Sequence, residues 1–109
     1  MIYTKITVKN RERDRRGQIS NFDNLPNDVK NNFKKIKEVI EKYFNKEMDV
    51  RITGSYLEGW YDEFSDYTVV INEETNLTEL KTLLINELQL DINIYFDINY
   101  HNYSSSIIL

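Results

Sequence analysis

Gly54 and Ser55 end a short apolar run, Gly59 follows four residues later, and Ser65 and Asp66 open a denser run. A Gly-Ser turn lets backbone N–H groups and a hydroxyl approach a phosphate closely. A carboxylate such as that of Asp66 is the kind of ligand that Mg²⁺ prefers. A simple turn and a strand cap are the alternative interpretations of the two segments.

Hydrophobic periodicity predicts the elements that would position these residues. One apolar stripe at helical spacing includes Val29, Phe33 and Ile36. Asn76 and Glu79 have the spacing of a capping box before a second helix. Alternating apolar residues indicate strands. We therefore expect helices at 26–44 and 77–88 and strands at 2–9, 48–53, 67–72, 90–98 and 100–109. Residues 54–65 predict a loop, with a helical turn within it as an alternative.

These elements predict a single domain over residues 1–109, of the α/β (α+β) class. We expect a mixed sheet of about four to five strands, with two main helices packed mostly on one face. The N-terminal strand and an arginine-rich loop, within residues 1–24, are an addition to this domain.

The pattern from Gly54 to Asp66 resembles the nucleotidyltransferase superfamily, of the polymerase-beta type, and its minimal members in bacterial toxin–antitoxin modules. In that family a strand leads into Gly-Ser and a nearby Gly. Ser-Asp-x-Asp then opens the next strand, and a later strand supplies a third carboxylate. Gly54, Ser55, Gly59, Ser65 and Asp66 match in type, order and spacing, and the resemblance covers roughly residues 29–98.

The resemblance implies a nucleotidyltransferase-like fold and a role for each matched residue. Asp91 is then the third carboxylate, and Asp66 and Asp91 are the Mg²⁺ ligands and, in an active protein, the catalytic residues. Mg²⁺ and a nucleoside triphosphate are the implied cofactors. The nucleotide would be bound by Gly54, Ser55, Gly59 and Ser65.

The sequence departs from the family at Thr68, where the second carboxylate is expected. Thr68 points to the same side as Asp66 because strand side chains alternate, but it is neutral. Asn93 and Asp97 share a strand face with Asp91. Loss of one strong electrostatic element can lower a rate by about 10²–10³. We therefore favour a degenerate, non-catalytic member, a pseudoenzyme.

Charge divides the chain at the start of this motif. Up to Thr53 there are 13 basic and 8 acidic residues, a net charge of +5; from Gly54 onward Lys81 stands against 10 acidic residues, a net charge of −9. Residues 10–17 predict a charged loop that could bind an acidic partner or phosphate through its arginines: Arg11, Arg13, Arg15 and Arg16. A hairpin tip with no binding role is the alternative.

Composition limits the remaining functions. The chain has no cysteine, which excludes disulfides and zinc–thiolate sites, and its single histidine, His101, cannot form a His-rich metal site. No apolar run is long enough for a membrane span, and the N-terminus lacks the apolar block of a signal peptide, so we expect a cytoplasmic protein without a membrane partner. The overall charge of −4 disfavours nucleic acid as a partner.

Three functions follow from these observations. We favour binding of a partner protein, as an antitoxin-like or inhibitor subunit or a phage or mobile-element accessory protein, with nucleotide binding allowed by the motif. The alternative is a Mg²⁺-dependent nucleotidyltransferase that modifies a protein or nucleic-acid acceptor. A homo-oligomer, with the basic half of one copy against the acidic half of another, is the third hypothesis.

Overall fold

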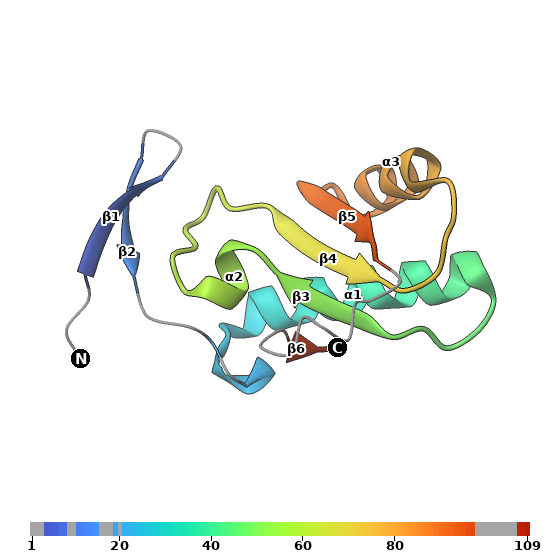
Figure 1. The fold of residues 1–109 in the computed structure, drawn as a ribbon, viewed down its shortest axis with the longest axis horizontal. Helices are drawn as coiled ribbons and strands as arrows, with labels where there is room; N and C mark the ends of the chain where they lie inside the picture. The colour runs from blue at the N-terminus through green and yellow to red at the C-terminus, as the bar shows by residue number, and fades with distance from the viewer. Residues whose placement is uncertain (1–3, 9–10, 16–18, 20, 98–106) are drawn as a thin grey trace.

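The computed structural model describes residues 4–8, 11–15, 19, 21–97 and 107–109. The chain is an α+β protein with a mixed sheet in the order β5-β4-β3-β6 and a separate two-stranded sheet, β1-β2 (Figure 1). The main sheet has three strands of four or five residues: β3 (Val50–Thr53), β4 (Tyr67–Ile71) and β5 (Ile92–Phe96). The two-residue β6 (Ile107–Ile108) pairs with the outer side of β3. The sheet is therefore smaller than the sequence predicted, with three full strands.

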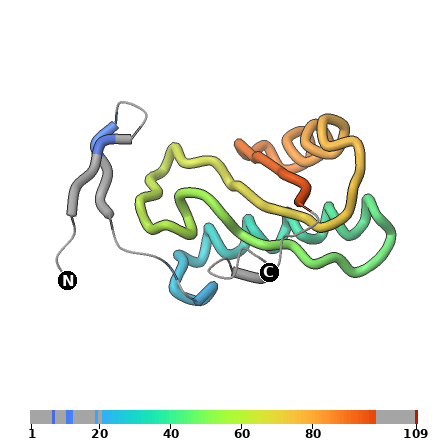
Figure 2. The backbone as a smooth tube through the Cα atoms, viewed as in Figure 1, coloured from blue at the N-terminus to red at the C-terminus, as the bar shows by residue number. Residues whose placement is uncertain are grey.

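The chain path explains why the sheet is mixed. After α1 (Asn27–Phe44), β3 runs back along the helix and pairs antiparallel with β4 (Figure 2). Helix α3 (Leu77–Leu88) then returns the chain, so β5 lies parallel to β4. Residues facing one another across all three strands include Thr53, Thr68 and Asn93. This register fixes which polar side chains meet.

The helices form where the periodicity predicts them. Pro26 precedes the first turn of α1, and Asn45 ends that helix in the left-handed conformation. Asn76 accepts a hydrogen bond from the Glu79 N–H at 3.1 Å, which confirms the predicted cap of α3. A short helix, α2 (Ser55–Glu58), begins directly after Gly54 within the segment predicted as a loop. No helix in the described ranges is apolar over a length that would span a bilayer.

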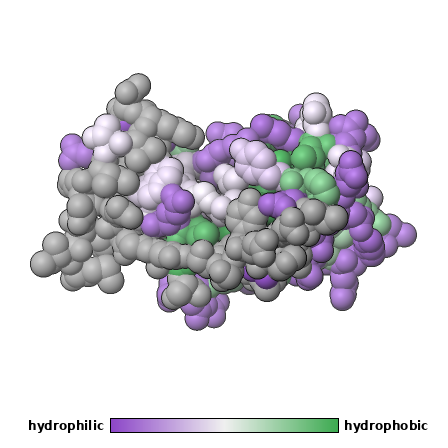
Figure 3. Space-filling model, in the orientation of Figure 1, coloured by the Kyte–Doolittle hydropathy of each residue, from purple (hydrophilic) through white to green (hydrophobic). Residues whose placement is uncertain are grey.

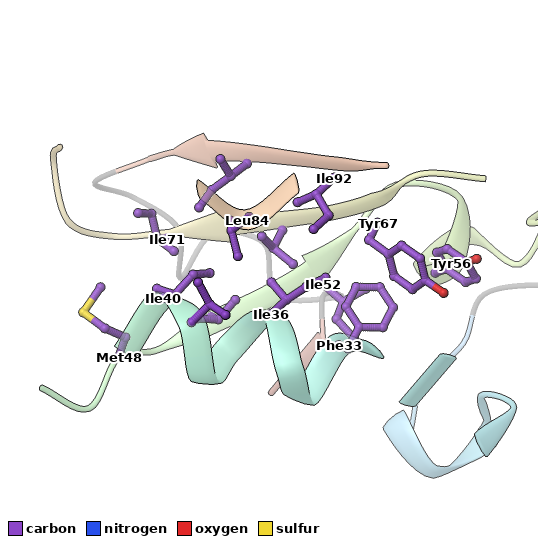
Figure 4. Close-up of a cluster of buried hydrophobic side chains, with 14 of the residues drawn as sticks. Phe33, Ile36, Ile40, Met48, Ile52, Tyr56, Tyr67, Ile71, Leu84 and Ile92 are labelled. Carbon is purple, nitrogen blue, oxygen red and sulfur yellow. The ribbon is translucent and has the colours of Figure 1, made fainter. Parts of the chain in front are cut away.

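One face of the sheet builds the core. The side chains of Phe33 and Ile36 from α1 and Leu84 from α3 are fully buried against Ile52 and Ile92 of the strands (Figure 4). Val70 is also buried but does not belong to this cluster, because it points to the opposite face of β4. Both main helices therefore cover one face, as the sequence predicted, and the other face is left to the polar side chains.

The N-terminal region differs from its prediction in one respect. β1 (Thr4–Val8) was expected as a strand, but Arg11–Arg15, expected in a loop, form β2 and pair antiparallel with it. Arg13 and Arg15 lie on this strand, whereas Arg16, His101 and most of the strand predicted at 100–109 lie outside the described residues.

Candidate functional site

The turn between β3 and α2 requires glycine. Gly54 has φ 80°, a conformation that side chains other than glycine rarely adopt. A Cβ at this position would also lie 3.1 Å from Thr68 Oγ1 and 3.2 Å from Thr68 Cβ. The Gly54 carbonyl accepts hydrogen bonds from the N–H groups of Leu57 and Glu58, at 3.1 and 3.0 Å. The turn thus brings Ser55 directly beside the neighbouring strand.

Ser55 is buried at the base of the turn. Its side chain is 4% exposed, and its Oγ has no hydrogen-bond partner among the residues that the structure describes. A buried hydroxyl without a partner costs free energy, so such a group is a candidate contact for a ligand. Ser55 is among the residues that line an open cavity, and its hydroxyl is buried beneath that lining.

Below this turn an aromatic cluster joins α2 to the core. The ring of Tyr56 stacks on that of Tyr67 at a centroid distance of 5.0 Å, and Phe33 meets it edge-on at 5.5 Å (Figure 4). Tyr61 stacks on Tyr56 at 4.8 Å. Burial, with the neighbouring Tyr67 hydroxyl, raises the pKa of Tyr56 well above its ordinary value. Asn32 donates to the Tyr67 hydroxyl at 2.8 Å. These contacts hold the turn rigidly on the sheet.

Ser65 and Asp66 have separate roles although they are adjacent. The Ser65 hydroxyl accepts from the Asp62 N–H at 2.9 Å and donates to the Asp62 carboxylate at 3.2 Å, so Ser65 closes the loop before β4. Arg11 clamps the same carboxylate, with Nε 3.0 Å from Oδ2, and lies over the Phe64 ring. Ser65 is therefore structural, and Asp66 is the residue of the pair that faces the cavity.

A polar chain crosses from α3 to Asp66. Lys81 donates from Nζ to Asn93 Oδ1 at 2.9 Å, and the Asn93 amide donates to Asp66 Oδ2. The positive charge of Lys81 therefore polarises the Asn93 amide, which strengthens the hydrogen bond that this amide donates to Asp66. The arrangement gives Asp66 a built-in donor and leaves only its Oδ1 without a partner among the described residues.

These groups surround an open cavity of about 510 Å³ on the outer face of the sheet. Such a volume is in the range of small-molecule and side-chain binding sites. In Figure 3, residues of intermediate hydropathy, shown pale, occupy the middle of the visible face. The lining combines one carboxylate with hydroxyls, an amide and two large aromatic rings: Thr53, Gly54, Ser55, Trp60, Asp66, Thr68, Val70, Asn93 and Tyr95.

The structure separates the predicted site residues into two groups. Gly54, Ser55 and Asp66 come together at the cavity, whereas Ser65 and Gly59 support the flanking loop and do not line it. Gly59, with φ 85°, ends α2, and its N–H donates to the Ser55 carbonyl at 2.9 Å. Asp91 is exposed at the entrance to β5, outside the cavity lining.

Several lining residues had no predicted ligand role. Asn93, which was predicted to share a strand face with Asp91, lies across from Thr68 because β5 pairs with β4 in that register. Its position two residues beyond Asp91 on the same strand face was the available signal. Trp60 comes from a loop and Tyr95 from the far end of β5, and their approach to the cavity depends on tertiary structure.

The donor set does not fit the Mg²⁺ that the resemblance implies. Asp66 is the one carboxylate in the lining, and Thr68 and Asn93 offer a hydroxyl and an amide that is already engaged. Within the described ranges, no three acidic or histidine residues lie close enough together to hold a metal ion. A two-metal site needs several charged oxygen ligands at one place.

Comparisons with known proteins do not assign the chain to a family. The chain matches no protein-family model, and searches of curated proteins and of solved structures found no match.

Proposed function

We propose that this chain has a nucleotidyltransferase-like fold and acts without catalysis, by binding a partner protein. The meeting of the Gly54–Ser55 turn with Asp66 at one cavity supports the fold resemblance. The Asn93 hydrogen bond to Asp66 is the observation that carries the non-catalytic assignment. It places an amide donor where a metal ion would have to meet the carboxylate.

The electrostatics of the site support the same conclusion. Lys81, the single basic residue after Thr53, donates to Asn93 and brings a fixed positive charge to the back of the site. A divalent metal ion at Asp66 would bring two further positive charges, and the one carboxylate of the lining would offset only one of them. The site therefore lacks the negative charge that a divalent metal ion needs.

The surface supports a role in protein binding. Phe64, in the loop that flanks the cavity, is 64% exposed, and Tyr95, in the lining of the cavity, is 55% exposed. Large exposed aromatic residues are enriched at protein interfaces. An antitoxin-like or inhibitor subunit, or a phage accessory protein, would use such a surface to bind its target.

Thermal unfolding with Mg²⁺ and ATP tests the non-catalytic assignment. A ligand present at 100 times its Kd stabilises a folded protein by about 2.7 kcal/mol. We expect no Mg²⁺-dependent rise in Tm for the wild-type chain. The double variant Thr68→Asp/Asn93→Asp restores two carboxylates beside Asp66 and should gain a Mg²⁺-dependent rise, because these positions face one another across the strands.

Labelling from α-phosphate-labelled nucleoside triphosphates provides the opposing measurement. We expect no Mg²⁺-dependent transfer to the chain or to proteins captured with it. Transfer that disappears in Asp66→Ala would overturn the assignment and establish the alternative, a Mg²⁺-dependent nucleotidyltransferase.

A further inference from the structure

We propose that the cavity binds a cationic side chain, arginine or lysine, from a basic segment of the partner protein. This inference rests on the proposed function and names the chemistry of the partner. The lining of the cavity includes one carboxylate, Asp66, and two large aromatic side chains, Trp60 and Tyr95. A carboxylate with aromatic faces is a combination that binds guanidinium and ammonium groups.

Asp66 keeps acceptor capacity for such a group. Asn93 occupies one of its carboxylate oxygens, and the other has no partner among the residues that the structure describes. Ser55 lines the same cavity, and its hydroxyl, without a described partner, is buried beneath the surface of the lining. A guanidinium group carries five N–H donors, and one of them can occupy the free carboxylate oxygen of Asp66.

The aromatic residues are placed to recognise the cation. Tyr95 is 55% exposed at the cavity, so its ring is accessible without displacement of core side chains. Trp60 donates from its indole nitrogen to Glu58 at 2.6 Å, which holds a second carboxylate beside the ring. Charge attracts the cation from a distance as well, since the chain carries a net charge of −4.

Lys81 does not oppose this occupant directly. Its ammonium group donates to the far side of Asn93, and Lys81 is absent from the cavity lining. The amide of Asn93 therefore separates the internal cation from the position that an arginine would occupy.

The tryptophan supplies the probe for the test, because Trp60 is the only one in the chain. The ligand is a blocked glycine-spaced peptide with four arginines, and the control peptide has citrulline, its neutral isostere, at each position. We expect a saturable change in Trp60 fluorescence with the arginine peptide and at least tenfold weaker binding of the citrulline peptide. Equal binding of the two peptides overturns the proposal.

Variants locate the binding at the cavity. Asp66→Asn should weaken the arginine peptide about tenfold, whereas Glu87→Gln, which removes one negative charge from the exposed side of α3, should weaken it less than twofold. Tyr95→Leu keeps the apolar bulk and should weaken binding about two- to fivefold. Because Tyr95 is exposed, this variant keeps the test valid if Asp66→Asn fails to fold.

The outcomes also separate this inference from the proposed function. Equal weakening by Asp66→Asn and Glu87→Gln, or no response to the peptide, overturns the cation site and leaves the non-catalytic assignment in place. A Trp60 response to Mg²⁺ and ATP instead of the peptide overturns both.

Discussion

The two faces of the main sheet differ in what their side chains do, although the same strands supply both. On the inner face Ile52 and Val69 are fully buried beneath the helices. On the outer face the adjacent residues of the same strands, Thr53 and Thr68, line a cavity. Alternation thus separates a face that packs in the core from a face that lines the cavity.

A pair of adjacent substitutions in β3 provides the largest test of this comparison. Ile52→Ala removes a fully buried side chain and should lower the free energy of unfolding by about 2–5 kcal/mol. Thr53→Ala changes the outer face and should lower it by less than about 1 kcal/mol. Urea unfolding of both variants measures the difference. Similar losses from the two substitutions would show that the outer face also carries the fold.

Much of the inner face could be predicted from the sequence because it depends on local periodicity. Val29, Phe33 and Ile36 recur at helical spacing, and the structure buries all three on α1. Asn76 was predictable for a different local reason, since its side chain has only to reach an N–H three residues away. Such signals lie within one or two turns of the chain.

The outer face was predicted less well because it depends on register between strands. The structure brings Asp66 and Ser55 to one cavity, and the side chain that donates to Asp66 is Asn93 and not Asp91. A shift of two residues keeps the strand face unchanged and alters which side chain reaches the site. Arg11 was expected in a loop because its charged segment lacks the apolar alternation that indicates a strand.

The boundary between the faces is tested next by Gly54→Ala. The new methyl group would meet Thr68 at 3.1–3.2 Å in a backbone conformation of φ 80°. Strain of this kind costs about 1–3 kcal/mol, and we expect that loss in chemical unfolding. The double variant Gly54→Ala/Thr68→Ala removes part of the contact and should lose less than the sum of the two single changes. Additive losses would contradict a contact between the turn and β4.

The smallest expected effect at neutral pH comes from Tyr56, which packs under the turn that carries Ser55. Tyr56→Phe removes the hydroxyl that contacts Tyr67 and should cost about 0.5–1.5 kcal/mol at pH 8. The raised pKa means that the folded chain keeps this proton when the unfolded chain begins to lose it. The stability that Tyr56 contributes is thus present below the ordinary tyrosine pKa of about 10 and declines as pH rises above it.

Alkaline unfolding separates this titration from the lost hydrogen bond. Between pH 8 and pH 11, the urea midpoint of the wild-type chain should fall more than that of Tyr56→Phe. The midpoint advantage of the wild-type chain should therefore narrow or reverse at pH 11. Parallel declines would show that Tyr56 ionises as readily in the folded chain as in the unfolded one. The stacked rings of Tyr56 and Tyr67 would then be accessible to water, and they would not separate the cavity from the core.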